Sequence, residues 1–215
     1  MTITEIREAR GARADPEETR ANILEVAMRE FADKGLAGAR IDEIAEKTKT
    51  SKRMIYYYFD GKDALYRAAL EAAYDRIRHS DAVPDLTSLS AEEALAENVR
   101  VTFDYHNDHP EFVRLVMNEN IHHGDHIAHV EGIKERNRSV ISALRAILDR
   151  GVADGVFRAG IDPVDLHMSI SALCFYNVSN RYTFSQGFEC DMTSPEAVAS
   201  RRERVIGMIL ASVRA

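Results

Sequence analysis

Hydrophobic positions along most of the chain recur every three or four residues, which is the spacing of an amphipathic helix. The clearest case lies in residues 16–34. Its apolar face comprises Ile23, Ala27 and Phe31, flanked by Leu24 and Met28. Asp15 suits the N-cap, Pro16 the first helical position and Gly35 the stop. The pattern therefore predicts a helix with both ends marked in the sequence.

The same spacing predicts eight further helical segments. They are residues 41–48, 51–59, 62–79, 91–107, 111–121, 125–150, 163–186 and 195–214. No segment alternates clearly enough to predict a strand. Residues 80–90 have no period and contain Pro, Ser and Thr, so we expect a linker there. The predicted fold is all-α with about nine helices, arranged as a mobile arm (1–15), a helical head (16–61) and a helical body (62–215).

Charge is unevenly distributed along the 215 residues. The formal net charge is −7, yet residues 1–65 are nearly neutral and no acid occurs from Lys47 to Phe59. An acidic body with a basic patch on its head fits a protein whose head meets a polyanion.

Composition disfavours several other classes of protein. No apolar stretch approaches the roughly 20 residues of a membrane span, and residues 1–18 lack the apolar core of a signal peptide. Cys174 and Cys190 do not make a disulfide framework, so we expect a reduced cytoplasmic protein. There is no nucleophile elbow and no phosphate loop, and no enzyme activity, cofactor or metal is predicted.

Residues 48–59, TKTSKRMIYYYF, place a basic cluster directly before an aromatic run. Together with residues 41–48 they predict two short helices joined by a tight turn. This is the helix-turn-helix arrangement, in which the second helix enters the major groove of DNA. Ile55 and Phe59 are four residues apart and should face the core of the head. The alternative is an aromatic core stripe beside a chance basic run.

Particular DNA contacts follow from this placement. The residues expected to face base edges are Ser51, Lys52, Arg53 and Met54. Tyr56 and Tyr58 are assigned to phosphate oxygens, and Tyr57 to the wall of the groove. Lys62 would bring both its charge and a helix N-terminus to another phosphate.

Residues 50–65, TSKRMIYYYFDGKDAL, resemble the signature of the TetR family of bacterial repressors. The matching positions are Ser51, Ile55, Tyr56, Tyr58, Phe59, Lys62, Asp63 and Leu65. The upstream segments LEVAMREFADKGL (24–36) and IDEIAEKT (41–48) also match, so the resemblance covers about residues 16–70. It implies a three-helix DNA-binding head, a connecting helix and an all-α body that binds a small effector, used as a homodimer.

The chain departs from the family pattern at the turn. Thr48, Lys49 and Thr50 stand where the family usually has Ala-Gly-Val, and Arg40 stands where Thr or Ser is common. A positive φ at a non-Gly residue costs about 1 kcal/mol, which Lys49 would tolerate because its charge faces phosphate. The Thr50 hydroxyl is expected to bond back to the turn. Arg40, Lys49 and Thr50 join the predicted DNA contacts.

The resemblance implies that the last two helices pair with a second copy, and their apolar residues fall on more than one side. The predicted seam on 163–186 is Leu166, Ile170, Leu173, Asn177 and Phe184, beside a row of Phe175, Ser179 and Tyr182. On 195–214 it is Val198, Val205, Met208, Ile209 and Leu210. The alternative is packing within one chain. A homodimer would hold two reading helices roughly 34–36 Å apart and predicts a palindromic double-stranded DNA operator.

The inward faces of the middle helices supply candidates for an effector site. They are Phe103, Phe112, Val116, His123, Ile141, Phe175, Tyr176 and Asn177. Aromatic walls with a few polar groups suit a small organic molecule, whereas ordinary core packing is the alternative for each residue. The favoured function is a ligand-responsive repressor.

Six of the eight histidines lie within residues 106–129. They are His106, His109, His122, His123, His126 and His129. His122 and His126 could share a metal ion, and one or two histidines could bind a carboxylate-bearing effector or sense pH. Solvated or capping roles are the alternative. A metal- or pH-responsive regulator, or a helical His-based metalloenzyme, therefore stands beside the favoured function.

Overall fold

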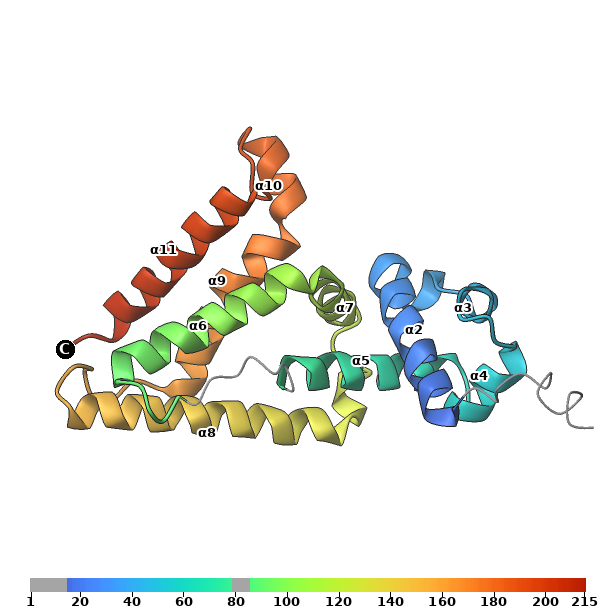
Figure 1. The fold of residues 1–215 in the computed structure, drawn as a ribbon, viewed down its shortest axis with the longest axis horizontal. Helices are drawn as coiled ribbons and strands as arrows, with labels where there is room; N and C mark the ends of the chain where they lie inside the picture. Colours follow the sequence, from blue (N-terminus) through green and yellow to red (C-terminus); the bar gives the residue numbers. More distant parts are fainter. Residues whose placement is uncertain (1–14, 79–85) are drawn as a thin grey trace, which may run out of the picture. The chain divides into compact units, whose positions relative to one another are not determined.

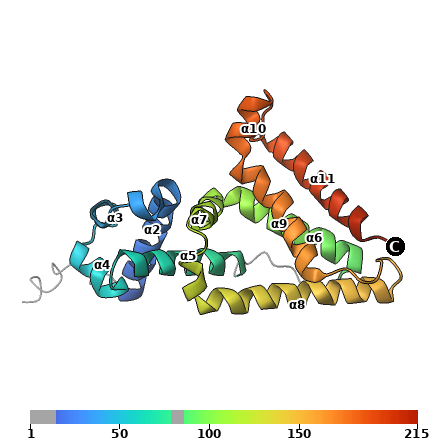
Figure 2. The same ribbon diagram turned by 180° about the vertical axis from the view of Figure 1, so that it is seen from behind.

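The computed structural model describes residues 15–78 and 86–215. Within these ranges the chain forms ten α-helices and one 3-10 helix, and no strand, which confirms the predicted all-α fold (Figures 1 and 2). The predicted mobile arm, apart from Asp15, and most of the predicted linker lie outside the described residues. Two compact units are present, the first ending at Ala69 and the second running from Leu70 to Ala215.

The first unit, called the head below, contains α2 (Pro16–Gly38), α3 (Ile41–Lys47), α4 (Lys52–Phe59) and the start of α5 (Lys62–Arg78). Asp15 caps α2 as predicted, accepting a hydrogen bond from the Glu17 N–H at 3.0 Å. Gly35, the predicted stop, is a kink with φ +67°, after which one further turn runs to Gly38. The stop signal thus bends the helix three residues before it ends.

The head is held together by fully buried side chains from all four helices. They include Ile23 and Phe31 of α2, Ile44 of α3, Ile55 of α4, and Leu65 and Tyr66 of α5. The Phe31 and Tyr66 rings meet edge to face with centroids 5.0 Å apart. Burying each such side chain contributes about 1.5–3 kcal/mol, so these contacts fix the positions of the two short helices.

A buried carboxylate links α2 to α3. Glu30 pairs with Lys34, whose Nζ lies 2.8 Å from its Oε2, and also with Lys47 at the end of α3. Burial raises the pKa of Glu30, but the hydrogen bonds from the two lysines outweigh burial and leave the pKa below its ordinary value. The charged form of Glu30 therefore secures α3 against α2.

The second unit, called the body below, contains the rest of α5, then α6 (Ala91–Asp108), α7 (Pro110–Ile121), the 3-10 helix η1 (Ile127–His129), α8 (Glu131–Ala153), α9 (Pro163–Ser179), α10 (Arg181–Gly187) and α11 (Pro195–Val213). Two predicted segments were too long. Residues 125–150 become η1 followed by α8, and residues 163–186 break at Asn180 into α9 and α10. The remaining helix bounds agree with the prediction within a few residues.

α6 runs through the middle of the body and packs against α8, α9 and α11 (Figures 1 and 2). Its start is fixed by a capping box, in which Ser90 and Glu93 each bond the backbone N–H of the other. Its buried face includes Leu95, Val99 and Phe103, which pack in one core with residues of α8, α9 and α11. The C-terminal end closes on this core, because the Arg158 N–H donates to the Val213 carbonyl at 2.9 Å.

Gly151 of α8 permits a close approach of Phe157. A Cβ at position 151 would lie 2.0 Å from Cδ2 of the Phe157 ring, far inside van der Waals contact. A glycine is therefore required where the loop after α8 folds back onto it. Among the described residues, no helix combines the length and the apolar character needed to cross a bilayer.

Candidate nucleic-acid interface and body cleft

The turn between α3 and α4 is held by hydrogen bonds from both sides. The Thr48 hydroxyl donates back to the Ile44 carbonyl at 2.8 Å, and the Thr50 N–H donates to the Ala45 carbonyl at 3.0 Å. Asn22 of α2 donates to the Thr48 carbonyl at 3.4 Å. In the described part of the chain, the hydroxyl that bonds back to the helix thus belongs to Thr48, and the expectation for Thr50 was wrong.

Lys49 adopts the left-handed conformation that the turn requires, with φ +53°. The positive φ expected from its position in the family pattern is therefore confirmed. A lysine with an exposed side chain thus occupies a position whose backbone conformation favours glycine.

The start of α4 is capped by Ser51, whose Oγ accepts from the Met54 N–H at 3.3 Å. Ile55 and Phe59 on its rear face are buried, as predicted from their four-residue spacing. The guanidinium of Arg20 lies 5.3 Å above the Phe59 ring and covers its outer side. α4 is thus anchored by its apolar side, and its opposite side is left open.

That open side carries the predicted DNA contacts. Lys52, Arg53, Tyr56 and Tyr57 are all exposed, and Tyr57, at 77%, is the most exposed large apolar side chain of the described residues. Met54 and Tyr58 are half-buried, and Tyr58 meets Tyr57 edge to face at 5.3 Å. The structure therefore brings these predicted residues onto one helix, where Lys52, Arg53, Tyr56 and Tyr57 are exposed to solvent.

Asp42, which the sequence did not single out, forms an ion pair with Lys52 across the turn. Both side chains remain about half exposed, at 48% for Asp42 and 56% for Lys52. An ion pair this exposed stabilises a protein by about 0–1 kcal/mol, so it does not lock the lysine away from an incoming phosphate or base.

The other predicted contacts flank α4. Arg40 occupies the N-cap position of α3 without a capping hydrogen bond from its side chain, and it is exposed. Lys62, at the start of α5, donates from Nζ to the Ala37 carbonyl at 3.3 Å. Part of its hydrogen-bonding capacity is therefore used to tie α5 to the end of α2.

The predicted effector residues do not converge on one cavity. Phe103 and Phe112 are buried in packed regions, Ile141 and Phe175 are half-buried, and His123 is exposed with φ +58°. Val116 lines a small cavity of about 160 Å³ with residues of α5 and α7, including Leu70, Tyr74 and Glu119. Only Tyr176 and Asn177 from the predicted set line the larger cleft.

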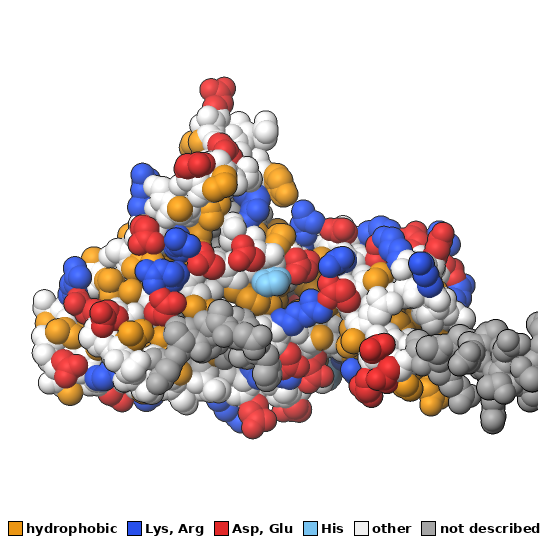
Figure 3. Space-filling model, viewed as in Figure 1, with side chains coloured by type: hydrophobic (Ala, Val, Ile, Leu, Met, Phe, Trp, Pro, Cys, Tyr) orange, Lys and Arg blue, Asp and Glu red, His pale blue; other side chains and the backbone are white. Residues whose placement is uncertain are grey.

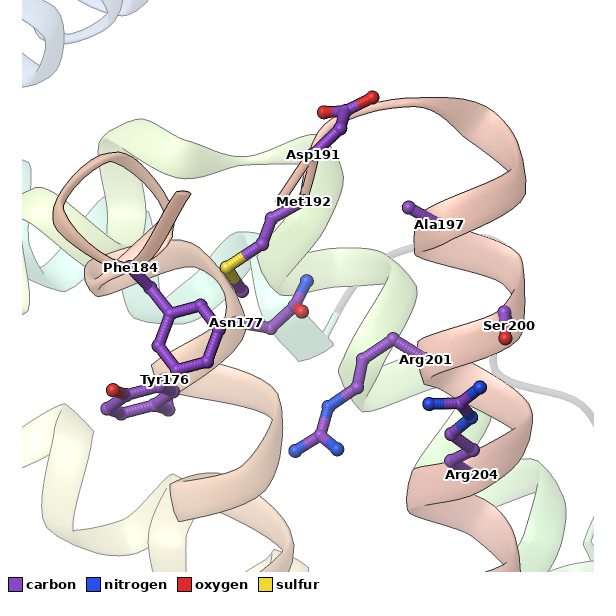
Figure 4. Close-up of a pocket in the computed structure, with 9 residues that line it drawn as sticks. All are labelled: Tyr176, Asn177, Phe184, Asp191, Met192, Ala197, Ser200, Arg201 and Arg204. Atoms are coloured by element: carbon purple, nitrogen blue, oxygen red, sulfur yellow. The ribbon is translucent and has the colours of Figure 1, made fainter. Parts of the chain in front are cut away.

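This larger cleft has a volume of about 470 Å³ and lies between α9, α10, the following loop and α11. It is lined by Tyr176, Asn177, Phe184, Asp191, Met192, Ala197, Ser200, Arg201 and Arg204 (Figure 4). Arg201 extends from α11 toward α9, whereas the Asp191 carboxylate points away from the cleft. Arg201 and Arg204 were not among the predicted effector residues, because that prediction rested on apolar inward faces. The signal in the sequence is their spacing of three residues, which places both on one side of α11.

The loop between α7 and α8 is organised by Glu119. This buried carboxylate accepts from the backbone N–H groups of His126 and Ile127 at 2.7 and 2.9 Å. The His126 Nδ1 also lies 3.3 Å from Glu119 Oε2. Glu119 thus replaces helical hydrogen bonds where the predicted long helix is interrupted.

The clustered histidines serve separate roles. His106 is buried, with Nδ1 donating to the Thr102 carbonyl at 2.6 Å, and burial lowers its pKa despite that bond. His109 pairs with Glu111 at 3.1 Å, while His122 and His129 are exposed. Within residues 15–78 and 86–215, no three His, Cys, Asp or Glu side chains gather in a way that would hold a metal ion.

On the face shown in Figure 3, acidic and basic side chains are interspersed over the body.

Comparison with known proteins agrees with this architecture. The family "Bacterial regulatory proteins, tetR family" matches residues 23–69, and "Tetracyclin repressor-like, C-terminal domain" matches residues 92–209. The HTH-type transcriptional repressor NicS of Pseudomonas putida is 35% identical over 190 residues, covering 88% of this chain and 90% of NicS. The HTH-type transcriptional repressor SCO4008 of Streptomyces coelicolor is 36% identical over 143 residues, covering 66% of this chain and 70% of that protein.

A solved structure shows the same fold. It is the crystal structure of a bacterial regulatory protein in the tetR family from Rhodococcus RHA1, which superposes with a TM-score of 0.72 at 20% identity and covers 92% of this chain and 98% of that one. The C-terminal family match alone spans more than half of the sequence, and the N-terminal match includes all of α3 and α4. The chain belongs to the TetR family of helix-turn-helix, DNA-binding transcriptional regulators.

Proposed function

We propose that this protein is a ligand-responsive repressor, which binds a palindromic operator as a homodimer and is released by a small organic effector bound in the body. The observation that carries the proposal is the exposed face of α4. Lys52 and Arg53 stand at the capped start of a helix whose rear is anchored by Ile55 and Phe59. A helix presented in this way can enter a major groove about 12 Å wide with its cations toward base edges.

The exposed residues divide into two roles. Lys52 and Arg53 are proposed to read guanine O6 and N7, with Met54 against thymine methyl groups. Tyr56 and Tyr58 are proposed to bond phosphate oxygens, which fixes register without reading sequence. Affinity should fall steeply with the logarithm of salt concentration, because bound phosphates release counterions.

An unpaired apolar stripe supports the homodimer. Val164 and Met168 lie four residues apart on α9, and both are exposed, Met168 by 63%. Met208 of α11 is also exposed. An apolar stripe of this kind is typical of a surface covered by a partner, and a two-fold dimer favours a palindromic operator.

Of the residues in this stripe, only Met208 belongs to the predicted seam. Leu166 and Ile170 of α9, with Val205 and Ile209 of α11, are buried in the core of their own chain. For these four residues the alternative of packing within one chain is correct. The proposed dimer surface is therefore the face of α9 turned away from that core.

Repression and effector release extend the proposal beyond the fold. Both relatives described above carry the name of repressor, which supports repression here. An effector that binds better to the DNA-free state would shift a two-state equilibrium by its difference in affinity. The body offers a cleft of a size suited to such a molecule.

The proposal is tested by selecting bound duplexes from a random-sequence library and measuring affinity for the selected site. We expect two half-sites whose centres are about one helical turn apart. The Lys52→Ala/Arg53→Ala double substitution should weaken binding by at least about 100-fold, since each base contact is worth about 1–3 kcal/mol. Arg145→Ala, at an exposed position of α8, is the matched control. Unchanged affinity in the double variant would reject the assignment of α4 as the reading helix.

A further inference from the structure

The cleft between α9, α10 and α11 concentrates positive charge in an acidic protein. Arg201 and Arg204 lie one turn apart on α11, and both line the cleft. In the described part of the chain, neither guanidinium has an ion-pair partner, although the neighbouring Arg202 pairs with Asp104 at 3.1 Å. Two adjacent unpaired guanidiniums favour an anion between or beside them.

A buried amide in the same cleft lacks a hydrogen-bond partner. Asn177 is only 3% exposed, and its Nδ2 has no acceptor in the described part of the chain. A buried donor left unpaired destabilises the fold, and almost all such groups in native proteins are satisfied. The amide points into the cleft (Figure 4). An acceptor supplied by a ligand there would satisfy it.

The one carboxylate of the cleft is already engaged. Asp191 accepts from the Thr193 N–H and hydroxyl, both at 2.7 Å, and from the Ser194 N–H. These hydrogen bonds, first from the Thr193 backbone and then from the side chains of Thr193 and Ser194, lower its pKa. Since Asp191 is committed to the start of α11 and points away, it does not neutralise the arginines.

The remaining walls are apolar and partly aromatic. Tyr176 and Phe184 meet edge to face with centroids 6.1 Å apart, and Met192 lies beside Phe184. Aromatic and thioether groups pack against flat rings, and a cleft of about 470 Å³ accommodates one or two fused rings.

We propose that this cleft binds a small planar aromatic carboxylate, with the carboxylate held by Arg201 and Arg204, an acceptor oxygen on the Asn177 amide and the ring against Tyr176 and Phe184. The inference rests on the proposed function in one respect, since it makes this molecule the effector. It places the effector between α9 and α11 rather than among Phe103, Phe112 and Val116. The ligand must combine negative charge with a flat apolar ring. A neutral ring would leave the two arginines without an anion, and a small anion without a ring would leave the aromatic wall uncovered.

The test is calorimetric titration of the full chain with benzoate and 2-naphthoate, each compared with its neutral amide. We expect at least one acid to bind with Kd between about 10 µM and 1 mM, and its amide to bind at least about tenfold more weakly. Arg201→Met should weaken the acid by at least about tenfold and leave the amide unchanged. Arg145→Met removes the same charge elsewhere on the body and should leave both unchanged.

Several results would overturn the proposal. They are no binding of either acid at about 1 mM, equal binding of acid and amide, or full binding by Arg201→Met. A double variant, Arg201→Met/Arg204→Met, that dissociates into monomers while the unmodified chain binds no acid would assign these arginines to subunit pairing instead.

Operator affinity is measured in parallel, so that the two proposals fail separately. If neither acid binds and the protein still binds its operator, the cleft proposal is rejected and the proposed repressor function stands. An acid that binds the cleft without weakening the operator complex would support the cleft and contradict its role as the effector site. Release of the operator by an acid that still acts on Arg201→Met would place the effector elsewhere.

Discussion

The exposed face of α4 and the cleft of the body use their polar groups in opposite ways. On α4 the polar ends reach solvent from one continuous stretch, and one cation, Lys52, is held by an exposed acid. In the cleft, Asn177 is buried and unsatisfied, and Arg201 comes from a distant part of the sequence. A surface that meets a long polyanion needs projecting charges, whereas one that encloses a small molecule needs unpaired groups inside. The unpaired amide in the cleft therefore lowers the stability of the fold while it serves binding, whereas the exposed side chains of α4 carry no such cost.

The largest effect should come from removing the anchor of α4. Ile55→Ala deletes a side chain that is fully buried between the helices of the head, and should lower the free energy of unfolding by about 2–5 kcal/mol. Thermal unfolding followed by circular dichroism measures the loss. Operator affinity should disappear, while acid binding by the cleft should persist.

Tyr57→Ala is the matched control on the opposite face. Because Tyr57 is exposed, its loss should change stability by no more than about 0.5 kcal/mol while still weakening the operator complex. Equal destabilisation by the two substitutions would mean that α4 has no distinct anchored and exposed faces.

The contrast also explains why the head could be predicted from the sequence. Ser51, Ile55 and Phe59 are close together in the chain, and helical spacing alone places the cap and the buried face. A site built on one short helix can therefore be predicted from one short segment of the sequence. The ion pair of Lys52 with Asp42 could not be predicted in this way, because helical periodicity does not relate side chains across a turn.

The body was predicted less well because its features depend on contacts between distant segments. Helical spacing indicates that Phe103 faces inward, but it does not distinguish a packed core from a cavity. The break at Asn180 has neither proline nor glycine to mark it. The delayed start of α8 depends on Glu119 bonding a loop seven residues later. Arg201 was not predicted to line the cleft, because a charged residue on an amphipathic helix is expected to face solvent.

A second effect tests the conflict between stability and function in the cleft. Asn177→Leu keeps the number and branching of side-chain heavy atoms but removes the unpaired amide, and should raise the free energy of unfolding by about 1–3 kcal/mol. Chemical denaturation measures this gain, and titration with 2-naphthoate should show weaker binding. Ser200→Ala, at an exposed position of the same cleft, is the control. A less stable Asn177→Leu variant would show that the amide is satisfied in the folded protein.

A third effect concerns the turn before α4, where strain and function meet in the head. Lys49→Gly relieves a left-handed conformation and should raise stability by about 1 kcal/mol. It also removes a cation, so the salt dependence of operator binding should fall by about one released counterion. Lys49→Asn, which tolerates the same φ without charge, separates the two effects. An unchanged salt slope in both variants would exclude Lys49 from the phosphate contacts.

A smaller effect should appear in the pH dependence of the body. Burial lowers the pKa of His106 below 6.5, against the raising effect of its bond to Thr102, and His167 lowers it further. The unfolded chain therefore takes up a proton that the folded chain resists, and stability is lost as pH falls through 6.5 toward the lower folded value. Unfolding of the unmodified chain should thus depend more steeply on pH in this range than that of His106→Leu. Parallel profiles would show that His106 is not held neutral.

The smallest effect isolates the one acid that competes for a DNA-facing cation. Asp42→Asn frees Lys52 from its exposed partner, at a stability cost of no more than about 1 kcal/mol, and should raise operator affinity by a few-fold. Glu46→Gln removes an equal charge from an exposed position of the same helix without touching Lys52. If both substitutions raised affinity equally, general repulsion of the phosphate backbone would account for the gain. A larger gain in operator affinity for Asp42→Asn, lost when Lys52 is also replaced by alanine, would show that the ion pair with Asp42 restrains Lys52 from contacting DNA.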